Sequence, residues 1–320
     1  MLVRRLERPT VLLAACAALV ACSSTPESDP RYRPAENLLE VVAVLRRHVP
    51  DDTYRFEPAR DYTGRNVYRS SLLRLENLEK LHADALRVGY MDGVIAFAKG
   101  RALERLRAYD LAADAYRLAA ERDPEIAAEA LRSADVCDGL HREMHQTDDL
   151  TTAIELVSLT PDADTAIARF DERQAVLEEL MRASEGTHHM IVIREEIEHC
   201  DVDRASYFLG LRKILPDGDV RATGELQRVV LRHRDSKDSS RHMLALAALY
   251  SSMAVEYVDT YPPESLGFDP ARFQELSDSA TRIYEMVATR DGTPEKLEAS
   301  RQLEAFLAFA LRIDRDRFTP

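Results

Sequence analysis

Several features that are common in enzymes and in nucleic-acid-binding proteins are missing from this sequence. It has only 11 glycines, and no glycine-rich loop follows a strand-like segment, so a phosphate-cradling site is not expected. No G-x-S-x-G motif marks a nucleophilic serine. No run of basic residues occurs in a chain of net charge −13, so nucleic acid is not expected as a partner. The sequence therefore predicts no cofactor and a protein that is not an enzyme.

Strand signals are also scarce, because β-branched residues almost never alternate with polar ones. Alanine, leucine, glutamate and arginine are abundant instead, and pairs such as Asp269-Pro270 repeatedly mark helix starts. The pattern predicts an all-α fold in which antiparallel helix pairs stack as a solenoid or an irregular helical array. The expected helices span residues 36–48, 65–87, 91–106, 110–122, 125–146, 148–158, 161–184, 187–199, 202–213, 220–233, 240–259, 270–289 and 294–312.

The longest apolar run, which includes Val11–Ala21, is too short for the roughly 20 residues of a membrane-spanning helix. Arg4, Arg5 and Arg8 precede it, and a positive start followed by a short apolar segment is typical of a secretory signal peptide. We therefore expect a cleaved leader at residues 1–21. A flexible tether rich in proline and serine follows at 22–35, and one α-helical repeat-like domain at 36–320.

The residues Leu19-Val20-Ala21-Cys22 resemble the bacterial lipobox. The resemblance implies that Cys22 is the lipidation site, that it is diacylated through its sulfur, and that the chain is a lipoprotein of the bacterial cell envelope. Ser23 replaces the aspartate that commonly retains such proteins at the inner membrane, which favours the outer membrane and a body that faces the periplasm. Two alternatives stay open. One is an ordinary signal peptide with an incidental cysteine, and the other is lipidation at Cys16, which a very short apolar run disfavours.

The negative net charge of the chain indicates which kind of partner it favours. Removal of residues 1–21, which carry three arginines and one glutamate, would change the net charge from −13 to −15. Such a body favours other envelope proteins with a basic surface. It disfavours electrostatic attachment to anionic lipid, which leaves the N-terminal lipid as the membrane anchor.

The segment Phe97–Pro124 resembles a tetratricopeptide repeat. In that family, small residues let two helices approach closely, a large residue fills the groove between them, and a proline closes the unit. The resemblance gives these packing roles to Gly100, Ala112, Tyr116, Ala119 and Pro124. The family pattern fails at Ala96, Lys99 and Leu103, so the repeat is degenerate.

A second, weaker unit lies further along the chain. Leu246–Tyr250 is similar to the family's L-G-x-x-Y, with Ala247 in place of glycine. Three later residues, Ala280, Tyr284 and Val287, repeat the spacing of Ala112, Tyr116 and Ala119. Between the two stretches lies an additional loop, Val258–Pro270, that an ordinary repeat lacks.

Candidate ligand residues do not form a convincing metal site. On a helix, Cys137, His141 and His145 would lie along one face, but ligands about 6 Å apart cannot easily reach one ion. The E-x-x-H pairs are interpreted as chance pairs rather than halves of a di-metal site. These pairs are Glu79/His82, Glu185/His188 and Glu196/His199. Cys137 and Cys200 are either disulfide-bonded or two buried thiols, and the sequence leaves both open.

Two functions are compatible with these features. The first is a lipid-anchored periplasmic helical-repeat protein that acts as a protein–protein interaction scaffold or assembly factor at the outer membrane. The alternative is a small-molecule-binding accessory lipoprotein, for example of a transport system, which needs an enclosed apolar pocket. Exposed candidate surfaces are Asp51–Arg69 and the 258–270 loop. Four tyrosines, Tyr54, Tyr62, Tyr68 and Tyr90, are interpreted as interhelix packing rather than a sugar or peptide site.

Overall fold

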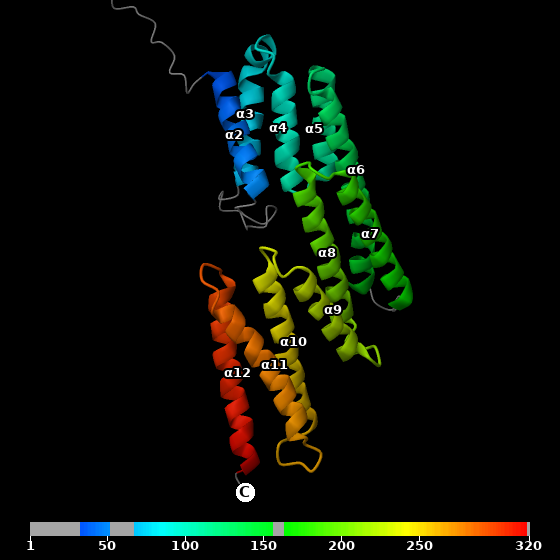
Figure 1. Ribbon diagram of the computed structural model, residues 1–320, viewed down its shortest axis with the longest axis vertical. Coiled ribbons are helices and arrows are strands. Elements are labelled where there is room, and N and C mark those ends of the chain that lie inside the picture. Colours follow the sequence, from blue (N-terminus) through cyan, green and yellow to red (C-terminus); the bar gives the residue numbers. More distant parts are fainter. Residues whose placement is uncertain (1–32, 52–66, 156–162, 319–320) are drawn as a thin grey trace, which may run out of the picture. The chain divides into compact units, whose positions relative to one another are not determined.

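The computed structural model describes residues 33–51, 67–155 and 163–318, and all the regular structure in these ranges is α-helical. The predicted all-α fold is therefore confirmed for this part of the chain, as an array in which neighbouring helices pack against each other (Figure 1). The helices are α2 (Pro34–Asp51), α3 (Val67–Val88), α4 (Asp92–Arg105), α5 (Tyr109–Arg122), α6 (Ala127–Glu155), α7 (Ala163–Ala183), α8 (His189–Gly210), α9 (Gly218–Arg232), α10 (Ser239–Thr260), α11 (Pro270–Ala288) and α12 (Glu295–Phe318).

Contacts between residues divide the chain into two compact units, Met1–Asp138 and Gly139–Pro320, and the division falls inside α6. In unit 1, α2 packs on α3, α3 on α4, and α4 on α5. Apolar side chains from the first three of these helices form one core because each helix carries apolar residues on the face toward its neighbour. This core contains Leu38, Val41, Leu45, Tyr68, Leu75, Leu78, Leu86, Ile95, Ala98 and Ala102.

Unit 2 repeats the same arrangement from α7 to α12. Each of these helices packs against the next one in sequence, and α10 also contacts α12. The main core joins α8 to α12 and is rich in aromatic side chains. Its largest members include Leu226, Leu246, Met253, Phe273, Leu276, Tyr284, Phe306 and Ile313.

The cap expected at Asp269-Pro270 is present at the start of α11. The Asp269 side chain accepts a hydrogen bond from the backbone N–H of Ala271 at 2.9 Å, and Pro270 occupies the first helical turn. The loop before it is held by Tyr257, whose hydroxyl accepts a hydrogen bond from the Asp269 N–H at 2.7 Å. The loop that departs from the tetratricopeptide pattern is therefore anchored at its C-terminal end.

Two expected helix breaks are wrong. The stretches 125–146 and 148–158 belong largely to the single helix α6, and 187–199 and 202–213 largely to the single helix α8. The second of these expected breaks lies at residues 200 and 201, between the two expected helices. In the structure Asp201 is buried in the middle of α8 and pairs with side chains of the next helix, so it does not serve as a cap.

The leader, Cys22 and most of the tether lie outside the described residues, as does most of Asp51–Arg69. Among the helices that the structure describes, none combines the length and the apolar composition that a membrane span requires.

Candidate functional site

The closest helix approach in the tetratricopeptide-like segment is between α4 and α5. Gly100 is buried in α4, and a Cβ atom built on it would lie 2.7 Å from Cε1 of Tyr116 in α5. Any larger residue would collide with the tyrosine ring unless one helix moved. Gly100 thus permits the close contact of these two helices.

The Tyr116 ring is fixed by polar and aromatic contacts. Its hydroxyl donates a 2.7 Å hydrogen bond to Oε2 of Glu104, which lies one turn after Gly100 on α4 and is 1% exposed. Phe97 packs edge-on against the ring, with centroids 5.1 Å apart. Burial, and the negative charge of Glu104 beside it, raise the pKa of Tyr116 well above its usual value. The hydroxyl therefore stays protonated and remains a donor.

The other three residues of this segment have different surroundings. Ala112 and Ala119 are fully buried on the same face of α5 as Tyr116, and Ala119 packs with Ala96 and Ala130. Pro124 is exposed in the turn between α5 and α6, where the side chain of Asp123 accepts a hydrogen bond from the N–H of Glu125.

The second tetratricopeptide-like segment is also buried. Ala280, Tyr284 and Val287 lie on the inner face of α11, and Leu246 and Ala247 lie on the inner face of α10. Tyr250 is partly exposed and accepts a hydrogen bond from Nε2 of Gln227 at 2.7 Å. The buried residues of both segments thus pack between helices, whereas Pro124 lies in an exposed turn and Tyr250 is partly exposed.

A larger polar cluster in unit 2 was not predicted. Asp201 of α8 is 1% exposed, and three side chains at the end of α9 converge on it. Nη2 of Arg228 lies 2.9 Å from Oδ1, and Nη1 of Arg232 lies 3.3 Å from Oδ2. Nε2 of His233 lies 2.8 Å from Oδ2. Burial alone would raise the pKa of Asp201, but the His233 hydrogen bond and the two arginine charges outweigh it and lower that pKa.

Glu198 lies one turn before Asp201 on the same face of α8. Its carboxylate connects α8 to the start of α10. Its Oε1 accepts a hydrogen bond from the hydroxyl of Ser236 and bonds to Nε2 of His242 at the start of α10. Burial acts to raise the pKa of Glu198, but the bonds from His242 and Ser236 prevail and lower it. The rings of His233 and His242 lie 6.3 Å apart, centroid to centroid.

We call Glu198, Asp201, His233, Ser236 and His242 the histidine–carboxylate cluster. It holds the α9–α10 turn against α8 through two buried carboxylate–histidine pairs. Both carboxylates and both imidazoles are less than a tenth exposed, so the cluster fixes three helices and does not offer an open reaction site. The sequence signal is weak: two acids three residues apart and two histidines on either side of a polar turn.

The candidate metal stripe lies on α6, where the structure describes the buried Cys137 and the partly buried His141. Cys137 is buried, and burial together with the nearby carboxylates of Glu104 and Asp138 raises its thiol pKa well above the usual range. His145 lies in α6 but its side chain is outside the described residues. Cys200 is also buried, and both cysteines are free thiols, which answers the question of the disulfide.

The E-x-x-H pairs have separate surroundings. Glu79 of α3 binds Nζ of Lys99 at 2.9 Å and Nη1 of Arg122 at 3.0 Å, while His82 interrupts the helical backbone of α3. Glu196 of α8 lies 3.5 Å from Nδ1 of His199 and 3.8 Å from Nη2 of Arg173.

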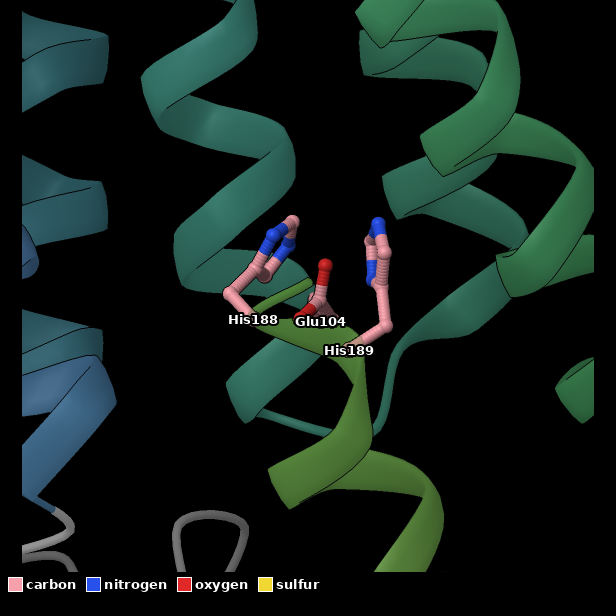
Figure 2. A group of neighbouring side chains, drawn as sticks. All are labelled: Glu104, His188 and His189. Carbon is pink, nitrogen blue, oxygen red and sulfur yellow. The ribbon is translucent and has the colours of Figure 1, made fainter. Parts of the chain in front are cut away.

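Figure 2 shows Glu104 and the histidine pair His188-His189 as sticks. The two histidine rings lie at the start of α8 with centroids 3.6 Å apart and planes inclined at 44°, and His189 is buried.

The tyrosines divide between packing and exposure. Tyr68 is buried, and the guanidinium of Arg105 lies over its ring, 5.3 Å from the centroid. Tyr90 is largely exposed in the turn between α3 and α4.

A hollow of about 30 Å³ lies beside Glu79, Leu86 and Arg122, with room for about one water molecule. A ligand of drug size needs roughly ten times that volume or more.

Comparison of the chain with models of protein families, with curated proteins and with solved structures finds no significant match.

Proposed function

We propose that the chain is a lipid-anchored helical scaffold of the bacterial cell envelope that holds other envelope proteins at the outer membrane, on its periplasmic side. The observation that carries the proposal is the combination of the lipobox-like residues Leu19–Cys22 with a body of neighbouring packed helices. Arrays of this kind present long side surfaces to partner chains.

The buried polar groups support a binding protein over an enzyme. Tyr116 is paired with Glu104, and Asp201 and Glu198 are paired with histidines in the interior. These groups are used in holding helices together. A net charge of −15 after cleavage of the leader favours a partner with a basic surface.

The anchor is tested by changing the cysteine that would carry the lipid. We expect Cys22→Ala to block cleavage of the leader and to remove lipid labelling, because the acyl chains are attached through that sulfur. The measurement is labelling with a radioactive or clickable fatty acid, together with fractionation of membranes and electrophoretic mobility. Cys16→Ala is the matched control and should be processed and labelled like the wild type. Normal labelling of Cys22→Ala would contradict the anchor.

The scaffold role is tested by purification of the wild type from membranes in mild detergent, followed by mass spectrometry. We expect a stoichiometric partner that is lost in Cys22→Ala and released as the salt concentration rises, because charge complementarity is screened by salt. If the labelled protein carries no partner and instead retains a bound small molecule, the scaffold proposal is wrong and the accessory-lipoprotein alternative is favoured.

A further inference from the structure

The two ends of unit 2 differ in the side chains that their turns expose. Consecutive helices of this unit run in opposite directions, so the turns lie alternately at its two ends (Figure 1). The described turns α7–α8, α9–α10 and α11–α12 expose no large apolar side chain, as is usual for turns in contact with water. At the other end, the α8–α9 turn exposes Ile214 and the α10–α11 loop exposes Tyr261 and Leu266.

Ion pairs hold the α8–α9 turn beside the end of α10. Arg212 and Lys213 of the turn both bind the carboxylate of Glu256, which lies one turn before the end of α10. The exposed apolar residues of the turn and of the α10–α11 loop therefore belong to the same end of the unit. We call Ile214, Tyr261 and Leu266 the apolar turn surface.

Aromatic and polar contacts fix the base of the α10–α11 loop. The hydroxyl of Tyr257 accepts a hydrogen bond from the N–H of Asp269 at 2.7 Å and donates one to the carbonyl oxygen of Asp269 at 3.3 Å. The ring of Tyr257 lies between those of Tyr261 and Phe268, with centroids 5.3 Å and 5.7 Å away. The loop thus has the same conformation at both of its ends only while these rings stay packed.

The tip of the loop is also held by its own contacts. The N–H of Ser265 donates a 2.8 Å hydrogen bond to the carbonyl oxygen of Pro262, and a Cβ atom built on Gly267 would lie 3.1 Å from Cδ1 of Tyr261. Leu266 lies between these contacts and is completely exposed. A side chain that is held out by a fixed loop costs little further ordering when it binds, which favours a partner with a preformed pocket.

The charges beside this surface are unbalanced. Asp259 and Glu264 are exposed and form no ion pair within the part of the chain that the structure describes. The basic side chains of the neighbouring turn, Arg212 and Lys213, are already bound to Glu256. The loop therefore combines an exposed leucine with two negative charges that the described residues do not neutralise.

We propose that the apolar turn surface is where the scaffold binds its partner, and that this partner is a protein with an apolar pocket bordered by lysine or arginine. The pocket receives Leu266, and the basic border faces Asp259 and Glu264. The same two carboxylates disfavour a phospholipid surface, because they would approach its phosphate groups. The proposal rests on the scaffold function and names its binding surface.

The test places the photoreactive amino acid p-benzoylphenylalanine at single positions of the full chain, which is then irradiated in intact cells of its host. We expect replacement of Leu266, and separately of Ile214, to give an adduct with the same envelope protein. Replacement of Leu231, which is exposed on α9, should give none. Peptide mapping by mass spectrometry should place the adduct from position 266 in an apolar part of the partner that lies beside lysine or arginine.

The basic border is tested by a pair of charge reversals. Glu264→Lys should lower the yield of the adduct from position 214 about tenfold or more, because like charges would then face each other. Glu285→Lys is the matched control, since Glu285 is exposed near the other end of α11 and the change in net charge is identical. Circular dichroism should show unchanged helix content in both variants.

The outcomes separate this proposal from the scaffold function. If position 266 gives no adduct while the wild type still carries a partner in mild detergent, the scaffold function stands and the apolar turn surface is not its binding surface. If neither experiment gives a partner, both proposals are wrong. Equal adducts from positions 266 and 231, an adduct with the mass of a phospholipid, or equal losses in Glu264→Lys and Glu285→Lys would each overturn the proposed partner chemistry.

Discussion

Gly100 is a residue whose lack of a side chain decides how two helices meet. The ring of Tyr116 occupies the space that a Cβ would need, and the ring cannot turn away easily because its hydroxyl is bonded to buried Glu104. A glycine in mid-helix ordinarily weakens a helix by about 0.5–1 kcal/mol relative to alanine. Here that cost is offset by the packing that it permits.

We predict that Gly100→Ala lowers the free energy of unfolding by about 1–3 kcal/mol, because the new methyl group overpacks the α4–α5 contact. Gly224→Ala in α9 is the matched control, since a Cβ there would meet nothing within 4 Å. It should raise the free energy of unfolding by about 0.5–1 kcal/mol. Urea denaturation followed by circular dichroism measures both, and changes of the same sign in the two variants would contradict the packing role of Gly100.

The resemblance to a tetratricopeptide repeat was sufficient to single out Gly100 and Tyr116 in the sequence. It could not find Glu104 as the partner of Tyr116, nor His233 as the partner of Asp201. These contacts are set by how one helix lies on another, and the sequence around Glu104 and Asp201 has the mixed charge of an exposed helix surface. A buried carboxylate in such a context has no local signal.

At the scale of elements, α8 shows why the helix ends were harder to predict than the helices. Asp201 has the residue type of a cap, but Arg228, Arg232 and His233 bind its carboxylate and the helix continues through it. At Asp269 the same residue type does cap a helix, because Pro270 follows it. The difference lies in the tertiary contacts of Asp201.

The histidine–carboxylate cluster predicts how the α8–α10 segment responds to acid. The pKa values of Asp201 and Glu198 are lower in the folded chain than their ordinary values of 3.8 and 4.5. The folded state therefore binds fewer protons than the unfolded state in this range, so the contribution to stability is complete above about pH 5 and is lost as pH falls through the folded pKa values. Thermal unfolding between pH 7 and pH 3 should show this loss below pH 5.

Asp201→Asn separates this effect from general acid unfolding. It should lower the free energy of unfolding at pH 7 by about 3 kcal/mol, since two arginines and a histidine lose a buried charge partner, and it should flatten the dependence on pH below 5. Asp171→Asn is the control, because Asp171 is exposed in its pair with Arg204 and should contribute less than about 1 kcal/mol. An equal response of the two variants would show that the cluster does not stabilise α8–α10.

At the scale of the whole molecule, each helix draws its main contacts from its neighbours in sequence. In unit 1 the contacts run from α2 to α5, and in unit 2 from α7 to α12. In such an arrangement stability is close to a sum of terms from adjacent helices, so a local change should remain local.

Hydrogen–deuterium exchange measures this directly. Gly100→Ala should speed exchange of backbone amides in α4 and α5 and leave those of α10 and α11 as in the wild type, since these helices belong to different units. Asp201→Asn should give the reverse pattern, with faster exchange in α8 and α9 and no change in α4. A uniform increase in either variant would mean that the chain unfolds as one cooperative body.

The two buried thiols have a consequence for how the chain matures. If the chain crosses a membrane unfolded into an oxidising compartment, Cys137 and Cys200 are open to oxidation until α6 and α8 are packed. The folded chain has both sulfurs free, so a bond between them would be a kinetic trap. The helices must then fold faster than the two thiols are oxidised. An array built from contacts between neighbouring helices favours this order of events, because local contacts form fast.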